Sequence, residues 1–239
     1  GILRKRNSVK YAWIQKQSVA LADVHIIMEA TGVYHEQAAY ALHDAGVKLS
    51  LANPAYVRHF ANGLAIKTKN DGMDSFVLAR YGLSTQPKLW NPAPVEARLL
   101  QALLSRREAV AQDLQRERNR EEKAQVANVP DKIQQSIETS ISFLEQQLKK
   151  LQDDIDDHID KHPKLKQDVK LLESIPAVGE RVGNTMLSVL HNHHFESAEQ
   201  VAAYLGLVPV EYQSGTSVLK RPHLSKTGSA SVRATLYMA

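Results

Sequence analysis

The chain has 239 residues, a formal net charge of +4 and no cysteine. This length exceeds one average domain, which favours two domains or one domain with a large helical insertion. The lack of cysteine excludes disulfides, cysteine-bound zinc and thiol catalysis. Because no 18-residue uncharged apolar run occurs and the N-terminus lacks a signal-peptide pattern, we expect a cytoplasmic protein without membrane segments.

The first third of the sequence has the pattern of an α/β fold. Residues 24–28 form a short apolar run that predicts a buried strand, and this strand ends at Glu29. A helix is predicted over residues 34–45, closed by Gly46, and a second strand over residues 47–51. Such a strand–helix–strand unit gathers ligands at the carboxyl ends of its strands, where Glu29 lies.

Acidic residues recur at the next predicted helix, which covers residues 74–81 and is stopped by Gly82. Asp71 and Asp74 are three residues apart, so both carboxylates face one side at the helix mouth. Alone, such acids simply complement the helix dipole, a stabilisation of roughly 0.3–1 kcal/mol each. With Glu29 they would make three carboxylates in one cleft, which repel one another unless a cation is present, and Mg²⁺ suits such oxygen ligands. Two such ions can stabilise the attacking and leaving oxygens of phosphoryl transfer.

A proline-rich segment, residues 87–94, predicts a linker to a helical middle part. Two long helices follow, separated by Pro130, and the simplest arrangement is an antiparallel hairpin arm. We expect this arm to join protomers, with purely internal packing of its apolar stripe as the alternative. The first helix carries an apolar stripe of Leu99, Leu103, Val110 and Leu114. The second carries a heptad seam of Ile133, Ile137, Ile141, Leu144, Leu148, Leu151, Ile155 and Ile159.

The last part of the chain combines short helices with a basic segment. Residues 174–183 predict a helix–glycine turn–helix arrangement like those whose backbone amides face a DNA phosphate, although a plain helical corner fits equally well. A helix is predicted over residues 197–204 and a polar loop over residues 211–217. Basic side chains without intervening acids then suggest phosphate contact, with a solvated basic tail as the alternative. The candidate nucleic-acid contacts are Arg181, Lys220, Arg221, Lys226 and Arg233.

Ser214 is the candidate nucleophile in this loop. A Ser-Gly pair in a polar loop is usually turn chemistry, and Ser214 alone is weak evidence. A serine that attacks a phosphodiester needs help to lose its proton, and Lys220, Arg221 and Lys226 follow closely enough to stabilise a pentavalent phosphate.

The histidines give a weaker signal. His158 and His162 have helical i,i+4 spacing but no third ligand, so we expect a solvated helix face rather than zinc. The histidines of the polar turn, His191, His193 and His194, favour loop or phosphate contact over metal binding.

Several motifs in a fixed order resemble one family. The segments at residues 27–34 and 69–74, leading into residues 77–81, look like the RuvC-like half of the DEDD insertion-sequence transposases. The segments at residues 173–179, 204–209 and 212–217 look like the C-terminal transposase half, and so do residues 224–228 and 233–237. The resemblance covers nearly the whole chain from about Val24.

This resemblance implies a fold and a chemistry. The fold is α/β plus α: an RNase H-like (RuvC-like) domain at residues 1–92, an antiparallel coiled-coil arm at 93–166 and a helical transposase domain at 167–239. In the family four acids bind Mg²⁺ and a serine forms a transient covalent link to DNA. Matched residue by residue, Glu29, Asp71 and Asp74 are the second, third and fourth acids, and Ser214 is the nucleophile.

Partners also follow from the resemblance. The family includes a Piv-type DNA invertase and bacterial insertion-sequence recombinases guided by a structured bridge RNA. Their active sites are assembled between protomers. We therefore expect donor and target DNA, a guide RNA and a homodimer or homotetramer, in the cytoplasm at the bacterial nucleoid.

The start of the chain departs from the family pattern. The first acid should follow a Gly-Ile pair on an opening strand, whereas Gly1-Ile2 precedes Leu3 and only 27 residues separate Gly1 from Glu29. We interpret Gly1-Ile2 as the remnant of that strand, with residues missing after it, and we expect the family's further helices beyond Ala239. A defective variant is the other interpretation. The alternatives in function are a non-catalytic nucleic-acid-binding assembly protein and a metal nuclease of the Holliday-junction-resolving type.

Overall fold

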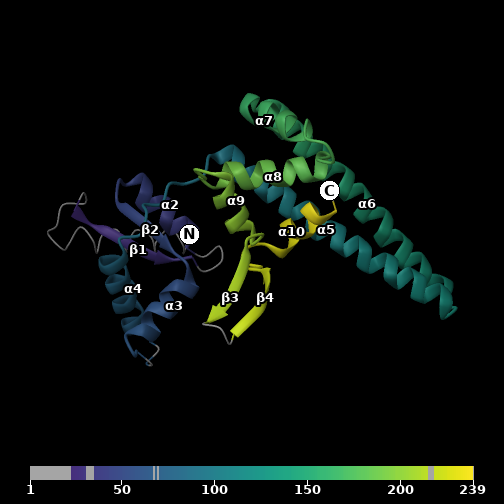
Figure 1. Cartoon of the computed structure of the whole chain (residues 1–239). Coiled ribbons are helices and arrows are strands. Elements are labelled where there is room, and N and C mark those ends of the chain that lie inside the picture. The colour runs from purple at the N-terminus through teal and green to yellow at the C-terminus, as the bar shows by residue number, and fades with distance from the viewer. Residues whose placement is uncertain (1–22, 31–34, 67, 69, 215–217, 239) are drawn as a thin grey trace. The chain divides into compact units, whose positions relative to one another are not determined.

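The computed structural model describes residues 23–30, 35–66, 68, 70–214 and 218–238, with backbone alone at 212–214 and 218–220 (Figure 1). The chain forms two compact units, Gly1–Pro92 and Ala93–Ala239. Gly1, Ile2 and the segment after them lie outside the described residues. No helix within these ranges is long and apolar enough to cross a membrane.

The first unit has the predicted strand–helix–strand arrangement. Strand β1 (His25–Glu29) pairs in parallel with β2 (Lys48–Ala52), and α2 (Glu36–Asp44) connects them. Gly46 has a φ of +77°, the left-handed conformation that ends a helix at lowest cost. Two more helices follow, α3 (Pro54–Gly63) and α4 (Asp71–Thr85). The prediction of an α/β first unit is thus confirmed.

Helices cover both faces of this sheet, and strand alternation determines which residue faces which helix. Ile26 and Met28 pack with Leu42 of α2 and with Val47. Ile27 points the other way, into a cluster with Val57 of α3 and Val77 of α4. On this face Gly82 comes so close to Ile27 that a β-carbon there would overlap the Ile27 side chain.

One expectation for this unit was wrong, and two connecting segments make contacts that the sequence did not reveal. Strand β2 ends at Ala52, and the Asn53 side chain after it accepts a hydrogen bond from the Ala55 amide and begins α3. Gly82 does not stop α4, which continues to Thr85, because the glycine is needed against Ile27. The linker predicted at residues 87–94 contains the boundary between the two units, and its start is hydrogen-bonded to β2: the Trp90 amide donates to Leu49 O over 2.6 Å, and Ser50 Oγ donates to Pro87 O and Lys88 O.

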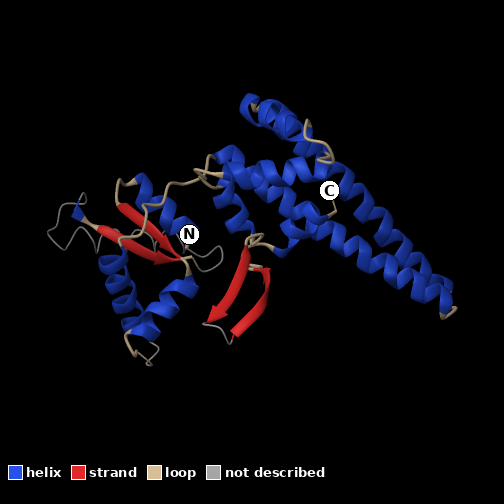
Figure 2. Cartoon of the chain, viewed as in Figure 1, coloured by secondary structure: helices blue, strands red, loops and turns tan. Residues whose placement is uncertain are grey.

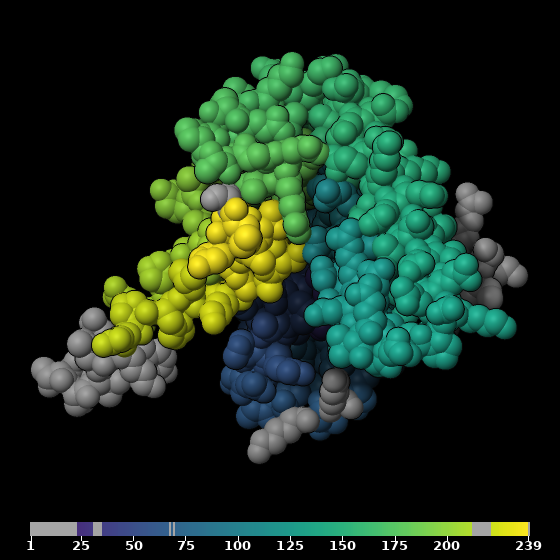
Figure 3. All heavy atoms as spheres, turned by 90° about the vertical axis from the view of Figure 1, so that its right-hand side faces the viewer, coloured from purple at the N-terminus to yellow at the C-terminus, as the bar shows by residue number. Residues whose placement is uncertain are grey.

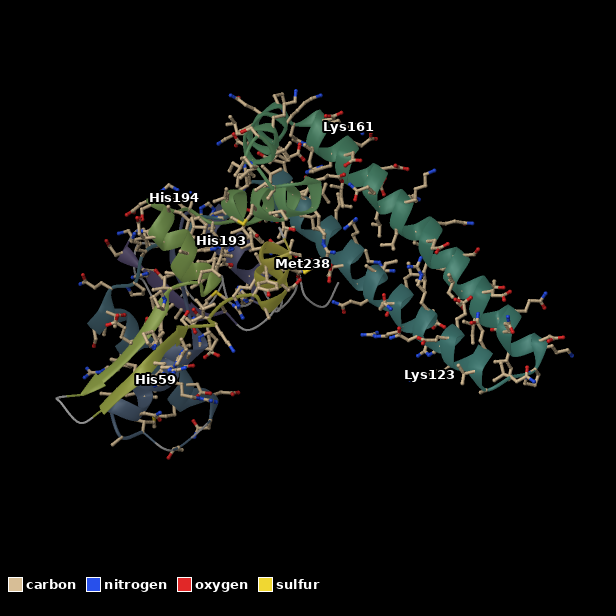
Figure 4. All side chains as sticks on the ribbon, turned by 45° about the vertical axis from the view of Figure 1, so that its right-hand side comes forward. His59, Lys123, Lys161, His193, His194 and Met238 are labelled. Atoms are coloured by element: carbon tan, nitrogen blue, oxygen red, sulfur yellow. The ribbon has the colours of Figure 1, made fainter. Side chains whose placement is uncertain are left out.

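The second unit is built on a long helical hairpin, which we call the arm (Figure 2). It consists of α5 (Val95–Val126) and α6 (Asp131–Lys161), packed side by side in opposite directions, as the heptad pattern predicted. Lys123 and Lys161 lie near opposite ends of the arm (Figure 4). The arm is followed by α7 (Pro163–Glu173), α8 (Glu180–Asn192), α9 (Ala198–Leu205), β3 (Pro209–Ser214), β4 (Val218–Leu224) and α10 (Ala230–Tyr237).

The core of this unit lies at the base of the arm. Leu100 of α5 and Ile155 of α6 are fully buried there, together with Leu165 of α7 and Leu187 of α8. The predicted stripe on α5 is off by one residue at its start, because Leu100 is buried whereas Leu99 is half exposed.

The predicted solvated histidine face of α6 was also wrong in part. His158 is buried, and its Nε2 lies 2.8 Å from the carbonyl oxygen of Glu96. The His162 Nδ1 lies 2.7 Å from His158 O in the same way. His158 thus joins α6 to α5, whereas His162 bonds back to the last turn of α6, and the buried His158 ring is tolerated because it is hydrogen-bonded.

The C-terminal part contains a β-hairpin where a loop was expected. Residues 211–214 continue β3, which pairs antiparallel with β4, while residues 215–217 lie outside the described part of the chain. The predicted helix at 197–204 is α9, capped by the Ser197 side chain. The helix–turn–helix at 174–183 is also present, but its left-handed residue is Ala177 (φ +72°) rather than a glycine.

Candidate active site and nucleic-acid interface

Glu29 is the last residue of β1, and its position follows from the strand. It follows Ile27 by two residues on the strand, and side chains two residues apart point to the same face. Glu29 therefore lies on the sheet face that α3 and α4 cover. The parallel pairing of Glu29 with Ala52 places both at the carboxyl edge of the sheet, from which α3 begins. Side chains of several elements therefore meet beside Glu29.

Asp74 lies at this edge in the first turn of α4, and it lines the same cavity of about 950 Å³ as Glu29. Asp71 is the first residue of α4, three positions earlier, and it is exposed and outside the lining of that cavity. The Asn70 side chain caps the helix by accepting from the Met73 amide. The structure thus brings two of the three predicted acids to one cavity.

Four polar residues that the sequence analysis missed line the cavity too, namely Arg58, His59, Asn62 and Thr68. Three of them belong to α3, and His59 is marked in Figure 4. The signal that could have found them is Asn53-Pro54 directly after a strand, because a helix starting there must begin beside Glu29.

The donor chemistry of the cavity fits a hard cation. Mg²⁺ is usually held by one or two carboxylates together with water and substrate phosphates, and Glu29 and Asp74 offer two carboxylates. Among the described residues, no three His, Asp or Glu side chains form a group that could hold a metal ion by themselves. Oxygens from water and from a bound substrate would have to complete the coordination shell of the ion.

The second unit holds Ser214, the last residue of β3, at the end of the strand away from the hairpin's base. The base is fastened to the C-terminal end of α9. Gly206 (φ +71°) and Gly228 (φ +76°) lie so close to the opposite backbone that a β-carbon on either would overlap a carbonyl oxygen. The Ser225 amide donates to Val208 O and the Lys226 amide to Gly206 O.

Arg233 of α10 completes this fastening. Its Nη1 donates to three backbone carbonyls: Thr227 O at 2.7 Å, and Leu205 O and Gly228 O at 3.2 Å each. These carbonyls come from both sides of the hairpin base, so one guanidinium links α9, the end of β4 and α10. We call this set of contacts the Arg233 clamp.

The other basic candidates lie in different surroundings. Arg221 and Lys226 are exposed, and Lys220 lies on β4 with only its backbone described. Arg181, in the first turn of α8, pairs with Glu108 of α5 at 3.2 Å. Because that pair is exposed, its stabilisation is small, about 0–1 kcal/mol.

The histidines of the predicted polar turn cluster at the end of α8. His191 Nε2 lies 2.8 Å from Asp168 Oδ2, which ties α8 to α7. His193 Nε2 lies 2.6 Å from the Tyr204 hydroxyl, and both rings pack with Phe195. Although part of the His193 ring faces solvent, this packing removes water from it and lowers its pKa, and burial likewise raises the pKa of Tyr204.

The two units together define an α/β plus α protein with a carboxylate cavity in one unit and a basic hairpin in the other. Comparison with known sequences assigns such a chain to DNA recombination. A profile described as "Transposase IS116/IS110/IS902 family" matches residues 169–239, and the DEDD transposase profile of the IS110 group matches residues 6–125.

Two relatives cover nearly the whole chain. The pilin gene-inverting protein of Moraxella bovis is 33% identical over 229 residues, which are 95% of this chain and 69% of the relative. The pilin gene-inverting protein of Moraxella lacunata is 34% identical over 229 residues, which are again 95% of this chain and 69% of the relative. The chain belongs to the IS110 family of transposases, as the motifs predicted.

Proposed function

We propose that this transposase cleaves and exchanges DNA strands with Ser214 as the nucleophile and with Mg²⁺ held by Glu29 and Asp74, joined by Asp71. The observation that carries the proposal is the shared cavity of Glu29 and Asp74, two carboxylates from separate elements. In a family of DEDD transposases, carboxylates gathered at a sheet edge are the expected place for phosphoryl transfer. The RNase H-like character of the first unit is part of the same proposal.

The covalent step can be written with its atoms balanced. The Ser214 hydroxyl oxygen attacks the phosphorus, its proton leaves to a base, and the P–O bond to the departing deoxyribose breaks with protonation of that oxygen. The reverse attack by the hydroxyl of another strand releases Ser214 and joins the new strand. When bound, Mg²⁺ supplies positive charge beside the phosphate oxygens. The exposed Arg221 and Lys226 side chains hold the backbone of the nucleic acid.

The nucleophile is tested by trapping the protein–DNA link. With a suicide substrate that loses its leaving strand, the wild-type chain should give a covalent adduct on a denaturing gel, and mass spectrometry should place it on residue 214. Ser214→Ala should give none, while Ser217→Ala, at the next serine in the sequence, should still give it. A covalent adduct formed by Ser214→Ala would rule out Ser214 as the nucleophile.

The acids are tested by isosteric amides. Glu29→Gln and Asp74→Asn should each abolish strand cleavage, with the salt-dependent affinity for DNA left within about twofold. Asp71→Asn should do the same if Asp71 joins the metal, as its place in the family motif implies. Full cleavage by Asp71→Asn would assign that carboxylate to the dipole of α4 instead.

Guidance by a structured RNA, and assembly as a dimer or tetramer, complete the proposal. Their support is the family membership together with the exposed basic hairpin. RNA that copurifies with the protein and restores sequence-specific recombination to a nuclease-treated sample would bear this out. Recombination at full rate without RNA would contradict it.

A further inference from the structure

The second unit contains a cavity that the proposed strand chemistry does not use. It has a volume of about 420 Å³, within the range of roughly 300–1,000 Å³ typical of small-molecule sites. Residues of five helices line it: α5, α6, α8, α9 and α10. In Figure 3, α10 (yellow) and the arm (teal) border a recess on this side of the unit.

Two buried polar side chains face this cavity without a partner. Asn184 of α8 is 5% exposed and Thr235 of α10 is 9% exposed, and both line it. Within the described part of the chain, neither the Asn184 amide nor the Thr235 hydroxyl makes a hydrogen bond. Neither belongs to the buried polar atoms that lack a partner, so their amide and hydroxyl groups reach the space of the cavity, where they are available to the donors and acceptors of a ligand.

The charged residues of the lining divide into paired and unpaired groups. Arg181 pairs with Glu108, and Glu180 accepts a hydrogen bond from Gln152. Arg107 of α5 differs, because its Nε is buried without a hydrogen-bond partner among the described residues. The cavity therefore offers one available cation beside a largely neutral set of amides and hydroxyls.

An aromatic residue completes the lining. Tyr204 of α9 lines the cavity together with His193, its hydrogen-bond partner. The bond to His193 and the packing with Phe195 hold the Tyr204 ring in place, so this aromatic wall of the cavity needs no ordering when a flat ligand packs against it.

We propose that this cavity receives one unpaired nucleobase of the bound nucleic acid, with its phosphate at Arg107. The inference rests on the proposed action on nucleic acid. Neutral amides and hydroxyls match the edge of a base, because asparagine and glutamine pair with base donors and acceptors in a bidentate way. An aromatic ring stacks on any base, and one arginine matches a single phosphate. The site therefore recognises a nucleotide that has left its helix.

Binding measurements can isolate this site from the strand chemistry. All are made with Ser214→Ala, so that no covalent link forms. The probes are fluorescent duplexes with one unpaired nucleotide and matched duplexes with an abasic residue at that position, each made as DNA and as RNA. We expect the probe with the unpaired base to bind on the order of tenfold more tightly than the abasic probe. Comparison of the DNA probes with the RNA probes shows which nucleic acid supplies the base.

Variants of near-equal shape test the named residues. Thr235→Val and Asn184→Leu should each remove most of the preference for the base, and Arg107→Gln should weaken both probes alike. Thr139→Val, on the exposed part of the arm, is the control and should change nothing. Thermal unfolding checks that each variant is folded.

A cross-linking measurement needs no variant. A 4-thiopyrimidine at the unpaired position should cross-link to Tyr204 or its neighbours in α8 and α10. Equal affinity for base and abasic probes, together with cross-links only outside these helices, would show that the cavity holds water alone and would overturn the inference. Such a result would leave the serine proposal intact, since that is tested separately by the covalent adduct.

Discussion

Arg233 was expected to contact nucleic acid, and the structure gives it three carbonyl oxygens instead. The Nη1 atom has two N–H groups, so it makes about two full hydrogen bonds shared among three acceptors. Each bond from a charged donor contributes about 1.5–3 kcal/mol, and partial exposure of Arg233 favours the low end. Arg233→Met keeps much of the stem but loses these bonds, and it should make local opening of the hairpin base easier by about 2 kcal/mol.

Hydrogen exchange measures that opening directly. The Ser225 and Lys226 amides donate to Val208 O and Gly206 O across the hairpin base. A loss of 2 kcal/mol should speed their exchange roughly 30-fold, since each 1.4 kcal/mol is a factor of ten. The amide of Trp90, in the other unit, should exchange at an unchanged rate and serves as the internal reference.

Arg233→Lys separates the clamp from a phosphate contact. Lysine keeps the charge but cannot bridge carbonyls with a planar group, so the exchange should again be fast while the salt dependence of DNA binding stays the same. The clamp would be refuted by unchanged exchange in both variants together with a salt slope reduced by about one in Arg233→Met alone, the signature of a lost phosphate contact.

Three further predictions concern stability. Gly82→Ala forces a β-carbon onto Ile27 and should lower the free energy of unfolding by about 1–3 kcal/mol, whereas Gly63→Ala, with open space around it, should lower it by nothing; equal effects in urea unfolding would contradict the close packing of α4 on β1. Because the folded-state pKa of His193 is lowered, the unfolded chain takes up this proton first as the pH falls below 6.5. The neutral His193 ring therefore contributes stability above pH 6.5, and this contribution is lost as the pH falls through the folded-state pKa. His193→Phe should flatten this part of the stability–pH curve, and an unchanged curve would contradict the prediction. Ser50→Ala removes a buried hydroxyl that donates to Pro87 O and Lys88 O and should cost about 1–3 kcal/mol, read from the thermal midpoint, with no shift expected for the exposed Ser136→Ala.

Local patterns predicted the secondary structure well where one residue decides the outcome. Gly46 ends α2 because glycine adopts a positive φ without strain. Gly82 shows the limit of the same rule: a glycine inside a helical pattern can mark a tight contact rather than an end, and only the partner, Ile27, tells the two apart. The partner lies on a strand more than fifty residues away, beyond any local window.

The candidate site shows a similar division. The order of motifs predicted the family, but it did not show which acids share a cavity. Glu29 and Asp74 meet because strand parity and the start of α3 bring their elements together, whereas Asp71, equally prominent in the motif, lies outside the cavity lining. Residues 211–214 were predicted as a loop because polar residues dominate there, yet pairing with β4 makes them a strand.

The placement of the acids and the serine in different compact units leads to a test of how the active site is assembled. Glu29 and Asp74 belong to the first unit and Ser214 to the second, so a complete site can use both units of one chain or one unit from each of two chains. We expect the second arrangement, with the arm joining the protomers.

Asp74→Asn and Ser214→Ala are each inactive under the proposed mechanism, and a mixture of these two variants distinguishes a site within one chain from a site shared between two chains. In a site shared between two chains of a dimer, each mixed dimer has one site with both residues intact. Random exchange of equal amounts should therefore restore about a quarter of the wild-type cleavage. In a site within one chain every copy lacks one residue, and no mixing ratio restores activity. A mixture that exchanges subunits and stays inactive would refute assembly between chains.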